Sequence, residues 1–230
     1  MFSCYHGTAA DTSHLIDHLE SYIFTTPAAP KITEHMVLGI SLGGHATWHC
    51  LLSDPRITVG VVGIGCPDYT RLMTDRARLS KLPTYMDTNP PGAAFLGSPD
   101  FPHALQDAIA LYDPAGLFLS GYLTPTSSSP ALPKPTHDAF NILARQRLHG
   151  KKILNLSGAV DKLVPYAAGE PFLQIFKQVV DEDQSLDIVF EDVLFEGVGH
   201  AFPEEMAEKA TSWLCDVLAC GEGGKVVSKM

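Results

Sequence analysis

The chain has little that would bind nucleic acid or span a membrane. Its 230 residues hold 16 Lys and Arg against 26 Asp and Glu, a net charge of −10 at pH 7, whereas a nucleic-acid partner usually requires a basic patch. No apolar run approaches the roughly 20 residues of a transmembrane helix, and the first residues lack the basic and apolar segments of a secretory signal. We therefore expect a cytoplasmic protein that binds neither nucleic acid nor membrane.

Cysteine is scarce as well, and its spacing does not indicate a structural role. The chain has five Cys residues, an odd number, and no C-x-x-C pair, which argues against a disulfide framework or a zinc cluster. Reduced thiols are typical of an intracellular protein. His45 and His49 have the spacing of H-E-x-x-H, but Ala46 stands in place of the Glu. We expect neither a metal nor an organic cofactor.

Short apolar runs alternate with amphipathic stretches, and 45% of the residues are apolar, enough for a sizeable core. Strands that alternate with helices predict a parallel sheet with helices on both faces. We expect one domain over residues 1–220 and a flexible tail at 221–230. The predicted strands are 35–40, 57–64, 152–156 and 186–195, and the predicted helices are 11–24, 43–53, 68–81, 165–181 and 203–219.

The middle of the chain is less regular. Residues 83–102 and 121–135 are rich in Pro, Gly, Ser and Thr, with helical pieces at 103–112 and 136–148. We interpret residues 83–148 as a lid-like insertion that supplies much of the substrate pocket. An ordinary long surface connection would explain the same composition.

The most informative stretch is GISLGG at residues 39–44. Its first five residues fit G-x-S-x-G, in which a Ser sits on a sharp turn between a strand and a helix. We expect Gly39, Gly43 and Gly44 to permit this turn, because a side chain there would clash with the neighbouring backbone.

Two further residues follow predicted strands in an order that suits acyl transfer. Asp161 lies in SGAVDKLVP after the strand at 152–156, and His200 lies in GVGHAFPEE after the strand at 186–195. The carboxyl ends of parallel strands meet at one edge of a sheet, so Ser41, Asp161 and His200 are expected to meet there. A Ser hydroxyl needs a base to become a nucleophile, His can serve as that base near pH 7, and a carboxylate orients the His.

On these motifs the chain from about residue 11 to 219 resembles the α/β-hydrolase superfamily. ISLGGHATW, GAVDKLVP and GVGHAFPEEM are most similar to the prolyl-oligopeptidase-like and dienelactone-hydrolase-like serine hydrolases of fungi. The resemblance implies that Ser41 is the nucleophile, His200 the base and Asp161 the orienting acid. It also implies that the Leu42 N–H is one oxyanion donor.

The front of the chain departs from that family, in which about four strands precede the helix that leads to the elbow and one loop, often with HGG, supplies a second oxyanion donor. Here His6-Gly7 is the only HG ahead of the elbow, and no predicted strand precedes it. We therefore expect a three-layer α/β-hydrolase-like parallel sheet that lacks the N-terminal strands. The elbow strand would then be an exposed apolar edge, which favours pairing with another chain, and we expect a homodimer through this edge.

Several other side chains are candidates for the pocket. Asp68 and Tyr69 follow the strand at 57–64, and His45 lies one helical turn after Ser41. We predict that all three contact the substrate, although Asp68 also suits a helix N-cap and His45 suits packing at the elbow. Arg71, Arg76 and Arg78 are interpreted as the solvated face of a helix.

Three functions fit these residues. The first is a cofactor-free serine hydrolase that cleaves an ester, thioester or amide of a small organic molecule. The second is an acid–base enzyme that opens an epoxide or closes a ring, with Asp68, Asp161 and His200 in place of Ser41. The chain is similar to short hydrolase-like proteins of fungal polyketide pathways, and this resemblance implies a role in fungal polyketide (secondary metabolite) biosynthesis. The third is a binding module without catalysis.

Overall fold

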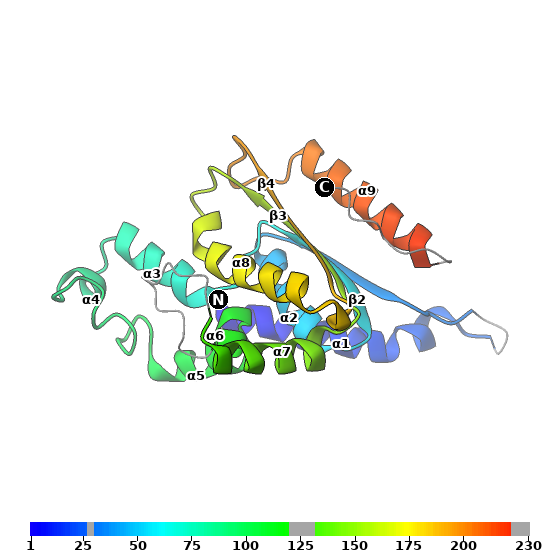
Figure 1. Cartoon of the computed structure of the whole chain (residues 1–230), viewed down its shortest axis with the longest axis horizontal. Coiled ribbons are helices and arrows are strands. Elements are labelled where there is room, and N and C mark those ends of the chain that lie inside the picture. The colour runs from blue at the N-terminus through cyan, green and yellow to red at the C-terminus, as the bar shows by residue number, and fades with distance from the viewer. Residues whose placement is uncertain (27–29, 120–131, 222–230) are drawn as a thin grey trace.

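A parallel sheet lies at the centre of the molecule. The computed structural model describes residues 1–26, 30–119 and 132–221. In these ranges the strands are β1 (His35–Ile40), β2 (Ile57–Gly63), β3 (Lys152–Gly158) and β4 (Val189–Phe195), in the spatial order β1-β2-β3-β4 (Figure 1). Every neighbouring pair is parallel, which confirms the predicted α/β architecture.

Helices connect the strands. Two helices come directly after strands β1 and β2, as predicted: α2 (Leu42–Ser53) and α3 (Tyr69–Leu79). The others are α1 (Phe2–Ile23), α4 (Pro83–Met86), α5 (His103–Tyr112), α6 (Pro114–Leu119), α7 (Lys134–Leu148), α8 (Tyr166–Glu182) and α9 (Glu204–Gly221), with a short 3-10 turn at Gln184–Leu186. No helix in the described ranges is long and apolar enough to cross a membrane.

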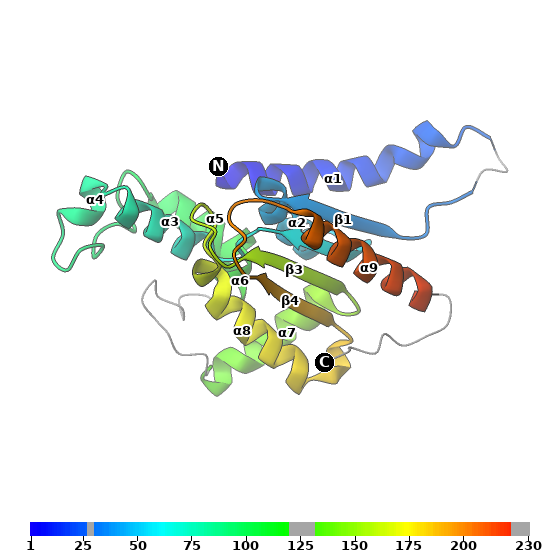
Figure 2. The same ribbon diagram turned by 90° about the horizontal axis from the view of Figure 1, so that it is seen from above.

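The helices cover the two faces of the sheet unequally. Figures 1 and 2 show α1, α2, α7 and α8 on one face and α9 on the other. Trp48 of α2 packs edge-on against Phe172 and Phe176 of α8 within the largest buried cluster. On the opposite face, Met206 and Trp213 of α9 belong to a cluster with apolar side chains of β2 and β3. The fold therefore has three layers.

The outer edge of β1 has no strand beside it among the described residues. Met36, Leu38 and Ile40 are 37%, 49% and 41% exposed, while Val37 packs against the core on the opposite face. An apolar edge of this kind can pair with another chain. The homodimer expected through this edge stays a prediction, which sedimentation at micromolar concentration tests.

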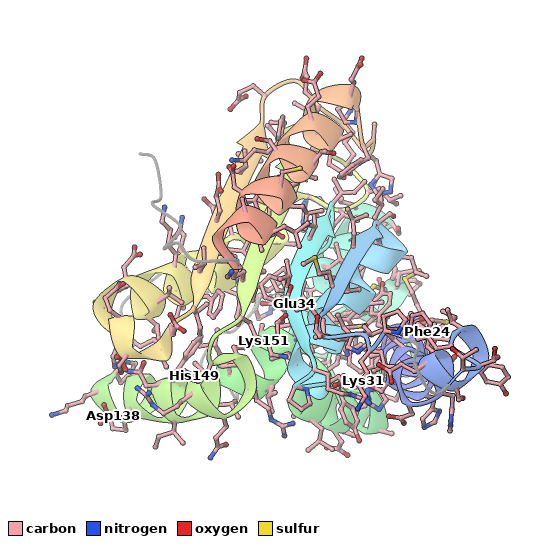
Figure 3. The ribbon with its side chains drawn as sticks, turned by 90° about the vertical axis from the view of Figure 1, so that its right-hand side faces the viewer. Phe24, Lys31, Glu34, Asp138, His149 and Lys151 are labelled. Carbon is pink, nitrogen blue, oxygen red and sulfur yellow. The ribbon has the colours of Figure 1, made fainter. Side chains whose placement is uncertain are left out.

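A buried lysine ties the end of α2 to the start of β3. Lys151, labelled in Figure 3, donates from Nζ to the carbonyl oxygens of Leu51 (2.6 Å) and Asp54 (2.7 Å). The last carbonyls of a helix lack partners within the helix, so the ammonium group satisfies them. Burial lowers the pKa of Lys151 to about 8, because a charged group loses hydration in the interior.

The first helix is longer than its sequence pattern indicated. It begins at Phe2 rather than at residue 11, and it includes His6 and Gly7. Phe2, Tyr5 and Ala9 are buried and lie at helical spacing, so tertiary packing extends the helix beyond the possible caps at residues 11–13. The His6-Gly7 pair is therefore helical and is no oxyanion loop.

The irregular middle divides into two parts. Phe118 of α6 and Phe140 of α7 have ring centroids 4.6 Å apart and belong to the main core, whereas Phe95 and Phe101 join a separate cluster with Tyr69. The short helices α4 and α6 were not predicted. Residues 120–131 of the Pro-rich stretch and 222–230 of the predicted tail lie outside the described residues.

The close approach of α2 to β2 yields a prediction about two adjacent glycines. A Cβ on Gly44 would meet the carbonyl oxygen of Gly63, whereas a Cβ on Gly43 would have nothing within 4 Å. We expect Gly44→Ala to lower the free energy of unfolding by about 1–3 kcal/mol through overpacking. The matched Gly43→Ala should leave it unchanged or raise it by up to about 1 kcal/mol, because Ala favours a helix. Urea denaturation measures both, and equal losses would contradict this explanation.

Candidate active site

Ser41 occupies the sharp turn between β1 and α2. Its φ of 56° and ψ of −113° are unusual for a residue with a side chain and are typical of strain at functional sites. The turn is held on both sides, since the Ser41 N–H donates to the Gly63 carbonyl (2.8 Å) and the His45 N–H donates to the Ser41 carbonyl (3.1 Å). A Cβ on Gly39 would meet the Gly43 carbonyl. Gly39 and Gly44 thus permit the turn as expected, while Gly43 has open space.

Three side chains that are distant in sequence form a continuous hydrogen-bond chain. Ser41 Oγ lies 2.8 Å from His200 Nε2, and His200 Nδ1 lies 2.8 Å from Asp161 Oδ2. A carboxylate accepts hydrogen bonds, so Nδ1 carries the imidazole proton and Nε2 is the acceptor for the Ser41 hydroxyl. The structure therefore brings together the three residues expected to meet at the carboxyl ends of β1, β3 and β4.

Backbone groups fix the Asp161 carboxylate. Its Oδ1 accepts from the N–H groups of Leu163 (2.7 Å) and Val164 (2.9 Å), and its side chain is fully buried. The His200 side chain is 26% exposed. The Asp161 carboxylate is therefore held by two backbone N–H groups and by the His200 ring, whereas part of the His200 ring stays exposed to solvent.

The loops that carry Asp161 and His200 are joined directly. Ala159 N–H donates to the Phe195 carbonyl (2.9 Å), and Val160 N–H donates to the Val198 carbonyl (3.0 Å). A Cβ on Gly158 would meet the carbonyl oxygens of Val198 and Gly199. The short distance between the two side chains thus depends on backbone contact at the end of β3.

Leu42 lies directly after Ser41 and starts α2. Its N–H belongs to the first turn, where backbone donors lack partners within the helix, and the positive end of the helix dipole points the same way. The Leu42 side chain is 49% exposed. This side of Ser41 is therefore open toward the β1 edge.

His45 and Tyr69, expected in the pocket, lie beneath the elbow. They are 4% and 5% exposed. The His45 ring stacks on Tyr5 with centroids 4.7 Å apart, and its Nδ1 accepts from the Cys66 N–H at 3.0 Å. Burial lowers the pKa of His45 to about 4, so this imidazole is neutral near pH 7. The ring centroids of Tyr5 and Tyr69 are 5.9 Å apart, so Tyr5 packs against both residues. In the sequence, only the helical spacing of Phe2, Tyr5 and Ala9 indicated that Tyr5 is buried.

Asp68 is likewise buried, at 3% exposure. It caps α3 by accepting the Arg71 N–H at 2.8 Å, which is the helix-cap alternative raised by the sequence. Asp113 lies nearby and accepts the Tyr69 N–H at 3.1 Å. Burial raises the pKa of Asp68 to about 6, and burial together with repulsion from Asp68 raises the pKa of Asp113.

Arg76 does not belong to a solvated helix face. Its Nη2 donates to the Leu163 carbonyl at 2.7 Å, two residues beyond Asp161. The charges of α3 alone did not indicate this contact. Arg76 lies seven residues after Tyr69, on the same helical face, and this spacing was the available indication that Arg76 faces the protein. Across the part of the chain that the structure describes, no cluster of three His, Cys, Asp or Glu side chains could hold a metal ion.

The chain was compared with known protein families, sequences and solved structures. No protein-family model matches the chain, and no curated protein matches its sequence. Among solved structures, the chain is similar to a variant of SOBER1 from Arabidopsis thaliana, at 14% identity and a TM-score of 0.49 over 93% of this chain and 65% of that chain. It is also similar to an acylaminoacyl peptidase from Pyrococcus horikoshii, at 14% identity and a TM-score of 0.49 over 94% of this chain and 28% of that one.

A puromycin hydrolase is a further similar structure, with 19% identity and a TM-score of 0.43 over 85% of this chain and 23% of that chain. The chain thus spans 65% of the plant protein and 28% of the peptidase. The activity of this chain therefore has to be inferred from the residues of its own site.

The contact at Gly158 predicts a loss of reactivity at Ser41. With Ser41 as the predicted nucleophile, we expect Gly158→Ala to separate the Asp161 and His200 loops. Acylation of Ser41 by 4-nitrophenyl acetate should then slow about 100-fold, since a displacement of about 1 Å can cost that much. Gly199→Ala is the matched control, because a Cβ there would have nothing within 4 Å. Equal rates for the two variants would show that the loop contact does not set the geometry.

The buried Asp68 predicts a pH dependence of stability. Its pKa is raised from 3.8 to about 6 on folding, so the folded protein keeps this proton to higher pH than the unfolded chain. Stability from this group is present below pH 3.8 and is lost as the pH rises to about 6. Asp68→Asn retains a capping side chain and should flatten the slope by up to about 1.4 kcal/mol per pH unit.

Urea denaturation at a series of pH values from 4 to 6 measures this slope. Asp11→Asn, an exposed change on α1, should follow the unmodified protein. A slope that is the same in Asp68→Asn as in the unmodified protein would refute the assignment.

Proposed function

We propose that this chain is an α/β-hydrolase-type serine hydrolase that cleaves an ester, thioester or amide of a small organic molecule. The observation that carries the proposal is the hydrogen-bond chain, 2.8 Å from Ser41 Oγ to His200 Nε2 and 2.8 Å from His200 Nδ1 to Asp161 Oδ2. Both distances lie within the range of a nucleophile activated by an oriented base.

The first half of the reaction transfers the acyl group to the enzyme. Ser41 Oγ attacks the carbonyl carbon while His200 Nε2 takes the hydroxyl proton, and the negative charge that develops on the carbonyl oxygen lies near the Leu42 N–H. When the intermediate collapses, His200 gives the proton to the leaving alcohol, thiol or amine. Asp161 holds the Nδ1 proton throughout and stabilises the imidazolium.

The second half repeats these steps with water. His200 removes a proton from a water molecule, the hydroxide adds to the acyl-enzyme, and Ser41 leaves with the proton returned by His200. The products are the free acid and the unmodified enzyme. Both halves use the three side chains described, the Leu42 N–H and water.

The number of oxyanion donors beside Ser41 limits the expected rate of ester hydrolysis. The position of Leu42 directly after Ser41, at the start of α2, supports its N–H as one oxyanion donor, and removal of one donor from a pair costs about 10²–10³ in rate. We therefore propose that simple esters are hydrolysed slowly unless the substrate or a partner chain supplies a second donor.

The acid–base alternative has less support. Opening an epoxide requires an acid at the departing oxygen, and the expected acid Asp68 is buried as a helix cap. Asp161 is also occupied by two backbone N–H groups and His200. The labelling experiment below separates the two reactions.

A fluorophosphonate probe tests the role of Ser41. We expect stoichiometric labelling of the unmodified protein and of Ser21→Ala, a matched change of an exposed serine on α1. Ser41→Ala should give no labelling, and His200→Ala and Asp161→Asn should slow it by about 10³–10⁴. Absence of labelling in a folded protein would refute the serine hydrolase. Epoxide turnover that survives Ser41→Ala would then favour the acid–base enzyme, and no turnover at all a binding module.

A further inference from the structure

Arg76 is a cation without an anionic partner in the described part of the chain. Arg56, Arg78 and Arg145 each form an ion pair with an Asp. The neighbour Asp75 pairs with Arg78 at 2.6 Å and not with Arg76. The Arg76 guanidinium instead contacts the Leu163 carbonyl at 2.7 Å and the sulfur atoms of Met1 (3.7 Å) and Met73 (4.0 Å).

The hydrogen-bonding capacity of this guanidinium is largely unused. Its Nε is buried and has no hydrogen-bond partner, and the thioethers beside Nη1 are only weak acceptors. A charged group in such surroundings costs free energy unless an anion or strong acceptors satisfy it. In a chain with 26 acidic and 16 basic residues, a carboxylate partner would have been easy to supply. None of the salt bridges formed by the described residues involves Arg76, so the guanidinium is available to an anion that binds beside it.

The position of Arg76 places this free charge beside the catalytic residues. Its Nη2 bonds to Leu163, the Leu163 N–H bonds to Asp161 (2.7 Å), and Asp161 bonds to His200. On the other side, Arg76 reaches Met1, and the next residue Phe2 packs against Tyr69 with centroids 5.0 Å apart. The guanidinium thus lies between the acid loop and the aromatic cluster beneath the elbow.

We propose that Arg76 binds an anionic group of the substrate, so that the preferred substrate is an ester, thioester or amide whose acyl part carries a carboxylate. A guanidinium recognises carboxylates through charge-assisted hydrogen bonds that are about twice as strong as neutral ones. This inference rests on the proposed serine hydrolase and adds the substrate class. Arg76 contributes binding, and it takes no part in the bond changes at Ser41.

A matched pair of esters tests the proposal. The probes are 4-nitrophenyl hydrogen succinate, which carries a carboxylate, and 4-nitrophenyl butyrate, which is of similar length and neutral. We expect the unmodified protein to prefer the anionic ester in kcat/KM, and Arg76→Gln to lower the ratio of anionic to neutral kcat/KM by about tenfold or more. Arg76→Lys, which keeps the charge, should recover part of the ratio.

Arg78→Gln is the matched control, since Arg78 lies two residues away and is paired with Asp75 on the surface. It should leave the ratio unchanged. A structural clamp on the acid loop would lower the two kcat/KM values equally in Arg76→Gln, and that result would overturn the proposal, as would a neutral-ester preference in the unmodified protein.

Two measurements separate the failure of this inference from the failure of the proposed function. A protein whose Ser41 is labelled by the fluorophosphonate but that shows no charge preference is a serine hydrolase without an anion site. If the fluorophosphonate labels the unmodified protein, succinate added beforehand should slow this labelling competitively. The protection by succinate should be lost in Arg76→Gln and kept in Arg78→Gln. Protection that is equal in both variants would overturn the proposal even if Arg76→Gln hydrolyses both esters poorly.

Discussion

The close approach of α2 to β2 is the constraint on which the site depends. Because Gly44 has no side chain, the first turn of α2 lies against the Gly63 carbonyl, and the chain reverses within Ser41 at a φ of 56°. This unfavourable conformation persists because backbone hydrogen bonds hold both sides of the turn. It lifts the hydroxyl above the end of β1 and directs it toward the His200 loop.

The interior beneath the elbow holds buried polar side chains among its aromatic rings, yet these polar groups add little charge to the site. His45 is neutral because burial lowers its pKa to about 4, and the pKa values of Asp68 and Asp113 are raised by burial. These groups satisfy backbone donors and helix ends, so their value is structural. The charged groups that remain in this region are Asp161, which is held by backbone N–H groups, and Arg76. In the proposed function, Arg76 is the group that would meet a negative charge of the substrate.

The site is enclosed on one side and open on the other. Toward β3 and β4 the acid and histidine loops are joined by backbone hydrogen bonds, while Ile40 and Leu42 beside Ser41 are 41% and 49% exposed. The hydrogen-bonded chain of Asp161, His200 and Ser41 is therefore preorganised. In the proposed reaction, stabilisation of the oxyanion would depend mainly on the start of α2. The same exposed strip continues along β1, where Met36 and Leu38 lack apolar cover among the described residues.

The sequence by itself determined the alternation of strands and helices, the parallel sheet and the trio of Ser41, Asp161 and His200, because these follow from local periodicity and from the fact that parallel strands end at one edge. Tertiary structure decided the rest. The start of α1 at Phe2 depends on burial of Phe2 and Tyr5 against α2 and α3, which no capping signal reveals. His45, Asp68 and Tyr69 lie below the site rather than facing it, because the pattern places a residue near a strand end but does not say which way its side chain points. Arg76 reaches the acid loop across 87 residues of sequence, a contact that only the packing of α3 against the rest of the fold creates.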